Sequence, residues 1–208
     1  RNKNYLKLSM DNILKVIELT LKLKSTFLNT KKPLIIANVG GHSMDQNIDE
    51  SEKLDAYEIL GESLIALKSN DYEIIPQNMA PFPWHFGGQR FQNLLVYPKE
   101  ITDFGKKNNI NFCIDTSHMI MTCNHFNLDM KKYLNLVHKY TKHLHIADAK
   151  GINQEGLQIG DGDSNFDQII QTIRKKFTNI SFIPEIWQGH KDHGKDFWIA
   201  LNHLNKKI

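Results

Sequence analysis

Residues 110–118 read Ile-Asn-Phe-Cys-Ile-Asp-Thr-Ser-His, and this stretch decides how the rest of the chain is interpreted. Its apolar part indicates a short strand that ends at Asp115, and His118 follows three residues later. In parallel α/β sheets, ligands bind at the carboxyl ends of the strands. A carboxylate and an imidazole at such an end therefore predict a functional site as well as a strand.

Four more short runs of the same kind lie on either side of this strand, at residues 34–37, 73–77, 143–147 and 180–185. Amphipathic stretches separate them and predict helices. The first begins after a cap at Ser9, the second carries an apolar stripe over residues 54–67, and the others cover 98–104, 130–140, 166–177 and 197–204. Alternating short strands and helices predict βαβ units and a parallel sheet. No linker or composition break divides residues 1–208, so a single α/β domain is expected.

The composition excludes several classes of protein. The chain has 208 residues, with 26 Lys+Arg against 23 Asp+Glu, and a net charge of +3 is too weak to indicate nucleic-acid binding. No window approaches the roughly 18 consecutive apolar residues that a membrane-spanning helix needs. Cys113 and Cys123 form neither a CxxC pair nor a disulfide framework, which suits a reducing compartment. A cytoplasmic protein with a small-molecule ligand is the expectation.

Polar residues at the strand ends predict a metal centre formed by Gln77, Asp115, His145 and Glu185. Because side chains of a strand alternate between its faces, these residues should converge on the inward face. Oxygen and nitrogen donors suit Mn²⁺, Mg²⁺, Co²⁺ or Zn²⁺ with open coordination positions. Such an ion can polarise a carbonyl and a neighbouring hydroxyl, which stabilises an enediolate while a carboxylate removes the proton. Alternatively, the carboxylates cap helices, the histidine belongs to the core, and the Gln77 amide binds a substrate hydroxyl.

Aromatic and imidazole side chains near the same strand ends are candidates for contact with a sugar. An indole can stack on the apolar face of a sugar ring, and imidazole or guanidinium groups can bind hydroxyl or phosphate groups. The alternative for each is a loop side chain that packs on its neighbours. The candidates for substrate binding are His42, Trp84, His85, Trp187 and His190, with Arg90 as a further one.

Four segments carry a resemblance to a known family: Cys-Ile-Asp-Thr-Ser-His at 113–118, His-Leu-His-Ile-Ala-Asp at 143–148, Ile-Gly-Asp-Gly at 159–162 and Pro-Glu at 184–185. In order and spacing they resemble the xylose isomerase-like TIM barrels, the sugar (phosphate) isomerase/epimerase superfamily that also includes apurinic endonucleases. The resemblance implies a TIM (β/α)8 barrel in which this chain lacks the first two strands and has a short seventh strand near 157–159. A complete barrel takes about 250 residues.

The resemblance also implies roles for individual residues. Gln77, Asp115, His145 and Glu185 match the four metal ligands of the family, and His118 matches a histidine that meets substrate or metal. The family pattern has Glu at the position of Gln77, and its two glutamates act as a proton-shuttling pair. Only Glu185 is retained as a base. The implied activity is a metal-dependent sugar or sugar-phosphate isomerase or epimerase.

Two other functions stay open. The Gln77 replacement is also consistent with a catalytically reduced carbohydrate-binding or regulatory module. Residues 185–190 resemble sugar isomerase-like domains beside or fused to sialic-acid-synthase-like enzymes of surface glycan biosynthesis, so a homo-oligomer or such a fusion is a possible assembly. An apurinic-site endonuclease is disfavoured, because the expected zinc ligands are replaced by Asn38, Gln154 and Gly156.

Overall fold

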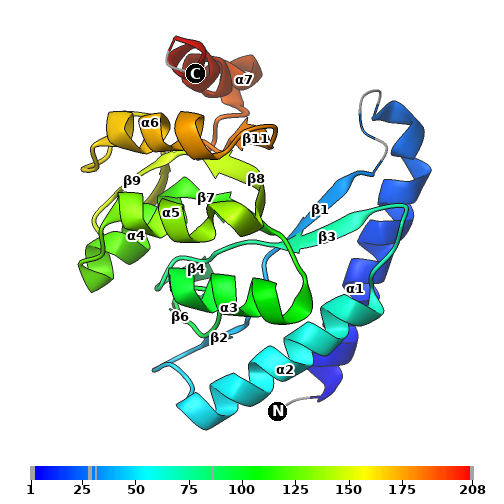
Figure 1. Cartoon of the computed structure of the whole chain (residues 1–208). Helices are drawn as coiled ribbons and strands as arrows, with labels where there is room; N and C mark the ends of the chain where they lie inside the picture. The colour runs from blue at the N-terminus through cyan, green and yellow to red at the C-terminus, as the bar shows by residue number, and fades with distance from the viewer. Residues whose placement is uncertain (1–2, 28–29, 31, 86, 207–208) are drawn as a thin grey trace.

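Five parallel strands form the centre of the fold in the computed structural model, which describes residues 3–27, 30, 32–85 and 87–206 (Figure 1). β1 pairs with β3, and β8 pairs with both β7 and β11. A parallel bridge between Gln77 and Cys113 joins the two groups. The order in the sheet therefore follows the order in the chain, as in a TIM barrel. These strands are β1 (Leu34–Ala37), β3 (Glu73–Pro76), β7 (Phe112–Asp115), β8 (Thr141–Ile146) and β11 (Ser181–Pro184).

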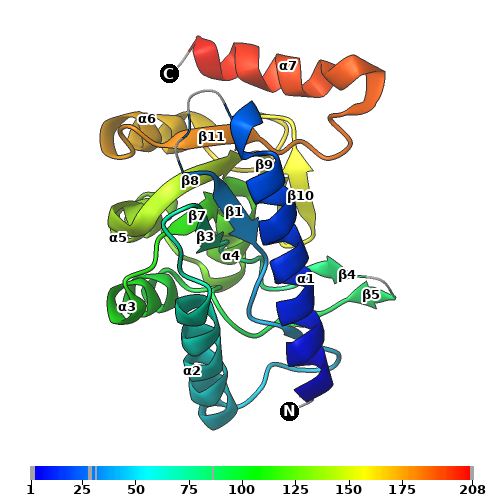
Figure 2. The same cartoon turned by 90° about the vertical axis from the view of Figure 1, so that its right-hand side faces the viewer.

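Helices follow or precede these strands and cover the outside of the sheet (Figure 2). They are α1 (Lys3–Lys22), α2 (Glu50–Ala66), α3 (Pro98–Asn108), α4 (Thr116–Phe126), α5 (Met130–Val137), α6 (Phe166–Lys176) and α7 (Lys191–Asn205), with 3-10 turns η1 (Lys24–Thr26) and η2 (His138–Tyr140). Short strands occupy the loops, namely β2 (His42–Ser43), β4 (Trp84–His85), β5 (Gly88–Gln89), β6 (Phe91–Gln92), β9 (Asp148–Lys150) and β10 (Gln154–Leu157). The predicted α/β class and the five main strands are confirmed.

The predicted start of the first helix is wrong. Ser9 does not cap α1, because the helix already begins at Lys3 and Ser9 lies inside it. Residues Leu6, Lys7 and Leu8 are good helix formers, so the helix extends through the position where a cap was expected.

Apolar side chains form two clusters of different size. The larger one includes Phe112, Ile114 and Leu144 of the central strands together with residues of α3 to α6. The buried members of the smaller one are Ile17, Ile35 and Leu67, so α1 docks on β1 and on the residue that follows α2 through few buried side chains.

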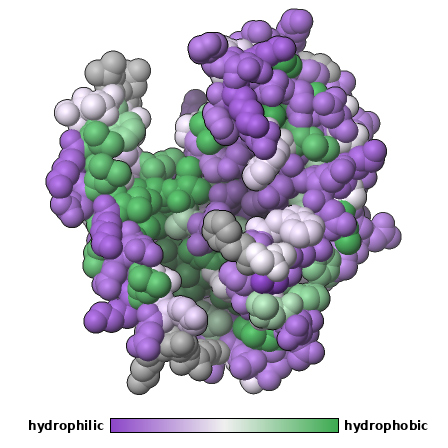
Figure 3. All heavy atoms as spheres, turned by 180° about the vertical axis from the view of Figure 1, so that it is seen from behind, coloured by the Kyte–Doolittle hydropathy of each residue, from purple (hydrophilic) through white to green (hydrophobic). Residues whose placement is uncertain are grey.

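Helix α1 also carries apolar side chains outside this small cluster. Leu8, Leu14 and Leu19 of α1 are more than half exposed. Figure 3 shows apolar surface gathered in the hollow between α1 and the rest of the molecule. Helix α1 therefore carries more apolar side chains than its contacts with the sheet bury.

The segment expected to hold a seventh parallel strand adopts a different structure. β10 pairs antiparallel with β9, and the residues from Gln158 onward in this segment form no strand in the described structure. Gly151 and Gly156 both have positive φ values, which let the chain turn back and bulge here. The predicted strand at 157–159 is thus wrong, and a hairpin stands over the carboxyl end of β8 instead.

Among the described residues, no helix combines the length and the apolar character that a membrane crossing requires.

Candidate metal centre

Asp115, His145 and Glu185 converge at the carboxyl ends of adjacent strands. Asp115 pairs with His145 in the register of β7 and β8, and Glu185 follows directly after β11, whose Ile183 pairs with His145. One ligand atom from each residue lies within 4.8 Å of the others. Three of the four predicted metal ligands are therefore brought together by parallel pairing alone.

The environment of His145 fits a metal ligand. His145 is buried. Its Nε2 has no hydrogen-bond partner, and its Nδ1 faces two carboxylates, 2.5 Å from Oε2 of Glu185 and 4.0 Å from Oδ2 of Asp115. A buried polar group without a partner costs about 1–3 kcal/mol. Two carboxylates and one imidazole are a donor set that divalent ions such as Mn²⁺ or Zn²⁺ accept. These three residues would hold such an ion.

Hydrogen bonds fix the carboxylate of Asp115. Its Oδ1 accepts from Oγ of Ser117 at 2.8 Å and from the backbone N–H of His118 at 3.0 Å, which caps α4. Burial raises the pKa of Asp115, but the charge of His118, the interaction with the Glu185 side chain and the hydrogen bonds donated by His118 and Ser117 outweigh burial and lower it below its ordinary value. Asp115 is therefore ionised and rigid.

Gln77 lies beside Asp115, at the end of β3. Its amide Nε2 donates to Oδ2 of Asp115 at 3.1 Å, and both side chains are buried. The neighbouring Asn78 donates from Nδ2 to the carbonyl of Asp115 and accepts from its backbone N–H. The amides thus hold the end of β7 in place. Coordination of a metal by Gln77 stays a prediction.

His118 is held between two acceptors. Its Nδ1 lies 2.9 Å from the carbonyl oxygen of Asn78, and its Nε2 lies 3.3 Å from Oε2 of Glu155 on β10. Burial lowers the pKa of His118, but the charges of Asp115 and Glu155 and its hydrogen bonds raise it to about 10. His118 is therefore a cationic donor at neutral pH. Sequence reasoning missed Glu155, because it lies on a hairpin rather than at the end of a strand of the central sheet.

Asp148 fixes the loop that contains the Ile-Gly-Asp-Gly segment. Its buried carboxylate accepts from the backbone N–H groups of Ala149, Gly160 and Gly162 and from Oγ of Ser164. A Cβ at Gly162 would lie 2.2 Å from Oδ1 of Asp148, so only glycine fits there. This carboxylate, already saturated with donors, organises the loop.

Two predicted substrate-binding histidines form a pair on the loops after β1 and β3. The rings of His42 and His85 stack with their centroids 4.1 Å apart. Burial, followed by the charges of His85 and Arg90, lowers the pKa of His42. Trp84 on β4 is 58% exposed and available for stacking. Contact of these residues with a substrate stays a prediction.

Trp187 and His190 follow Glu185 along the chain. The backbone N–H of Trp187 donates to the carbonyl of Gly156 at 2.7 Å, while the side chain is 70% exposed. His190 is the residue before α7, and it is exposed. Both lie in the loop that begins at the candidate metal ligand Glu185, and their substrate contacts likewise remain predicted.

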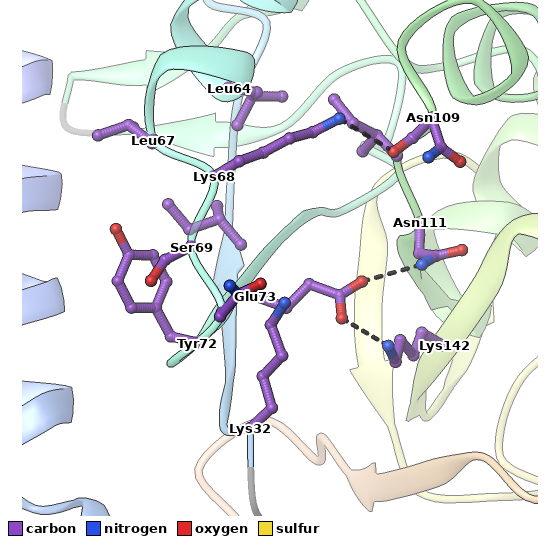
Figure 4. A pocket seen from close by; sticks show the side chains of 13 residues that line it. Lys32, Leu64, Leu67, Lys68, Ser69, Tyr72, Glu73, Asn109, Asn111 and Lys142 are labelled. Carbon is purple, nitrogen blue, oxygen red and sulfur yellow. Dashed lines mark hydrogen bonds and ion pairs between the residues drawn. The ribbon is translucent and has the colours of Figure 1, made fainter.

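A separate cavity lies away from these residues. A cavity of about 470 Å³ opens beside Glu73, Asn111 and Lys142, which lie at the amino ends of β3, β7 and β8 (Figure 4). Glu73 accepts from Nδ2 of Asn111 and pairs with Lys142, so its charge is already compensated. The cavity is therefore at the opposite end of the strands from the three converging ligands, and we do not assign the chemistry to it.

The fold and the residues at its strand ends define the class to which the chain belongs. Residues 1–205 match the family described as the Xylose isomerase-like TIM barrel, and the chain is a member of it. This confirms the family resemblance that the sequence motifs indicated. Comparison with curated proteins finds no significant match.

Solved structures share this fold at low sequence identity. A D-tagatose 3-epimerase-like protein is 17% identical with a TM-score of 0.67, over 99% of this chain and 73% of that one. D-psicose 3-epimerase from Clostridium cellulolyticum H10 is 16% identical with a TM-score of 0.67, over 99% and 72%. A probable 3-DHS dehydratase from Bacillus anthracis is 11% identical with a TM-score of 0.63, over 95% and 71%. Part of each of these chains has no counterpart in residues 1–208.

Proposed function

We propose that this chain is a metal-dependent sugar or sugar-phosphate isomerase or epimerase. The observation that carries the proposal is the convergence of Asp115, His145 and Glu185 within 4.8 Å, with His145 buried and its Nε2 without a hydrogen-bond partner. Similarity of the fold to sugar 3-epimerases supports a small carbohydrate as the substrate. A role in glycan biosynthesis, a cytoplasmic location and an oligomer or fusion remain predictions.

The side chains of the site suit proton transfer next to a carbonyl. A divalent ion, when bound, polarises the carbonyl and hydroxyl oxygens of a sugar. The side chain of Glu185 is 51% exposed, so it can reach a substrate and remove a proton from the carbon beside the carbonyl. His118 presents a cationic ring near the same carboxylates, where its charge can stabilise an oxygen that gains negative charge.

A second candidate function follows from Gln77. Because a neutral amide occupies this strand end and donates to Asp115, the chain could bind a sugar without turning it over. This reading corresponds to a carbohydrate-binding or regulatory module. Turnover measurements separate it from the enzyme.

Metal binding provides the first test. We expect the wild-type protein to bind Mn²⁺, and Asp115→Ala and His145→Ala to weaken binding at least about 100-fold, because each removes a ligand. Isothermal titration calorimetry on chelator-treated protein measures the affinity. Asp161→Ala is a matched control, because Asp161 is an exposed carboxylate outside the centre. Equal, negligible Mn²⁺ binding in all four proteins would contradict the proposal.

Sugar turnover provides the second test. We expect the Mn²⁺-loaded protein to interconvert ketose epimers, with D-tagatose, D-psicose and L-ribulose as the probes, and Asp115→Ala to abolish the reaction. Chromatography of the sugar products measures it. Sugar binding without turnover would favour the binding module over the enzyme.

A further inference from the structure

Inversion at a carbon next to a carbonyl needs two proton-transferring groups that reach opposite faces of that carbon, or one that moves between them. Glu185 is one exposed carboxylate of the centre. Asp115 is not available for this task, because its carboxylate is buried and is held in place by hydrogen bonds from Ser117, His118 and Gln77. The amide of Gln77 cannot act as an acid or base. A second group must therefore come from outside the four predicted ligands.

Glu155 is the described carboxylate whose contacts place it at this centre without making it part of the metal set. Its Oε2 lies 3.3 Å from Nε2 of His118, and its side chain is 32% exposed. The Nδ1 atoms of His118 and His145 each lie 4.0 Å from Oδ2 of Asp115. Two series of side-chain contacts thus start at Asp115. One leads through His145 to Glu185, and the other leads through His118 to Glu155. Each series ends in a partly exposed carboxylate.

Backbone contacts hold the two outer carboxylates on the same rim. The N–H of Trp187, two residues after Glu185, donates to the carbonyl of Gly156, the residue after Glu155, at 2.7 Å. A Cβ at Gly156 would lie 3.2 Å from Cβ of Trp187 and 3.4 Å from the carbonyl oxygen of Glu185. Gly156 also has a φ of +67°, so glycine permits this close approach.

The other end of the hairpin is fixed as well. Nε2 of Gln89 on β5 donates to Oδ1 of Asn153 at 2.8 Å, next to β10. Glu155 therefore belongs to a hairpin that is tethered to the segment after β11 and to the loop after β3. Its side chain is presented by a supported element, although it lies outside the central sheet.

We propose that Glu155 is the second proton-transferring residue of this site and takes the part that a carboxylate at the position of Gln77 would otherwise have. The proposal rests on the proposed sugar epimerase function. One of Glu155 and Glu185 accepts the proton from the carbon beside the carbonyl, and the C–H electron pair forms the carbon–carbon double bond of an enediolate while the carbonyl oxygen takes the negative charge. The other, protonated, delivers its proton to the opposite face of that carbon. Proton exchange with water restores both groups, and no oxidant or reductant is needed.

The test separates inversion from proton exchange. Mn²⁺-loaded wild type, Glu155→Gln and Glu155→Asp are incubated with D-tagatose, D-psicose or L-ribulose in D₂O. We expect Glu155→Gln to lower epimerisation at least about 100-fold, in the range that a general acid or base contributes. Of the two epimers of a sugar, only the one whose C–H bond faces Glu185 should still take up deuterium at the reacting carbon. Glu155→Asp should restore part of the inversion.

Two controls accompany these variants. Glu58→Gln makes the same chemical change on an exposed position of α2 and should leave epimerisation unchanged. The Mn²⁺ affinity of Glu155→Gln, measured by calorimetry, should agree with that of the wild type within about threefold, because Glu155 is not one of the candidate metal ligands.

The remaining outcomes overturn the assignment in different ways. If Glu155→Gln epimerises the sugars at the wild-type rate, Glu155 is not the second proton-transferring residue, and the proposed function still stands. Loss of Mn²⁺ binding would make Glu155 a ligand instead. Loss of inversion together with loss of deuterium entry into both epimers, with Mn²⁺ binding intact, would mean that Glu155 alone transfers both protons. Wild-type protein that neither epimerises nor exchanges any of the three sugars would overturn the proposed function together with this assignment.

Discussion

Asp115 is the residue through which the candidate centre is organised. It caps α4, accepts from Gln77, and lies 4.0 Å from the nearest ring nitrogens of His118 and His145. A buried carboxylate tolerates this position because donors surround it, and its lowered pKa keeps it charged. Any change beside it alters the balance of charge at the centre.

Changing Gln77→Glu tests this balance. The new carboxylate would face Oδ2 of Asp115 at the 3.1 Å contact of the present amide, without its donor. In metal-free protein we expect a lower free energy of unfolding, by up to about 4 kcal/mol, the repulsion of two unit charges about 4 Å apart near a protein surface. With Mn²⁺ bound, the added negative charge should instead tighten the affinity about tenfold or more.

Calorimetry with chelator and with Mn²⁺ measures both effects. Gln171→Glu on the exposed side of α6 is the matched control and should change neither quantity. A variant that is equally stable without metal and binds Mn²⁺ no better than wild type would show that residue 77 does not face the ion.

At the scale of elements, β8 carries two histidines on one face, of which only His145 belongs to the predicted metal set. His143 is buried, and its Nδ1 lies 2.6 Å from Oγ of Ser181 on β11. Burial, and then the charge of His145, lowers the pKa of His143 to about 4. His143 is therefore neutral in the folded protein, where it joins β8 to β11.

This pKa predicts how acid affects the metal-free protein. The unfolded chain binds a proton at His143 near its ordinary pKa of about 6.5, whereas the folded chain does so only near 4. The contribution of neutral His143 to stability is thus complete above pH 6.5 and is lost as the pH falls toward 4. His143→Asn can still bond Ser181 but does not titrate, so its stability should depend less on pH in this range.

Urea unfolding of both chelator-treated proteins at several pH values between 7 and 4 gives the comparison. Parallel loss of stability in the wild type and in His143→Asn would show that another group causes the acid sensitivity.

At the scale of the whole molecule, the two apolar clusters predict unequal local stability. The small cluster of Ile17, Ile35 and Leu67 attaches α1, whereas α3 to α6 pack on the large cluster around Phe112 and Leu144. Segments with few buried contacts open at a lower free energy. We expect the amide hydrogens of α1 to exchange faster than those of α4 and α5.

Hydrogen exchange followed by mass spectrometry checks this expectation. Ile17→Ala should accelerate exchange in α1 further and leave α4 and α5 unchanged, because Ile17 belongs to the small cluster. Uniform exchange of all helices would mean that the molecule opens as a single unit.

A feature could be predicted from the sequence where a local pattern of residues encodes it. Strand positions were predictable because short apolar runs ending in polar residues are a local signal, and Asp115, His145 and Glu185 were predictable because parallel strands place their ends together. Local signals failed at Ser9, which lies inside α1, and at 157–159, where a hairpin replaces a strand.

The sequence by itself determined the five central strands and the convergence of three candidate ligands, because periodicity and strand ends are properties of neighbouring residues. Only the tertiary structure decided that Glu155 lies against His118 and that the amide nitrogen of Gln77 points at Asp115. Those contacts join residues far apart in the chain, and they depend on the path of a hairpin and on the register between strands, which no local pattern encodes.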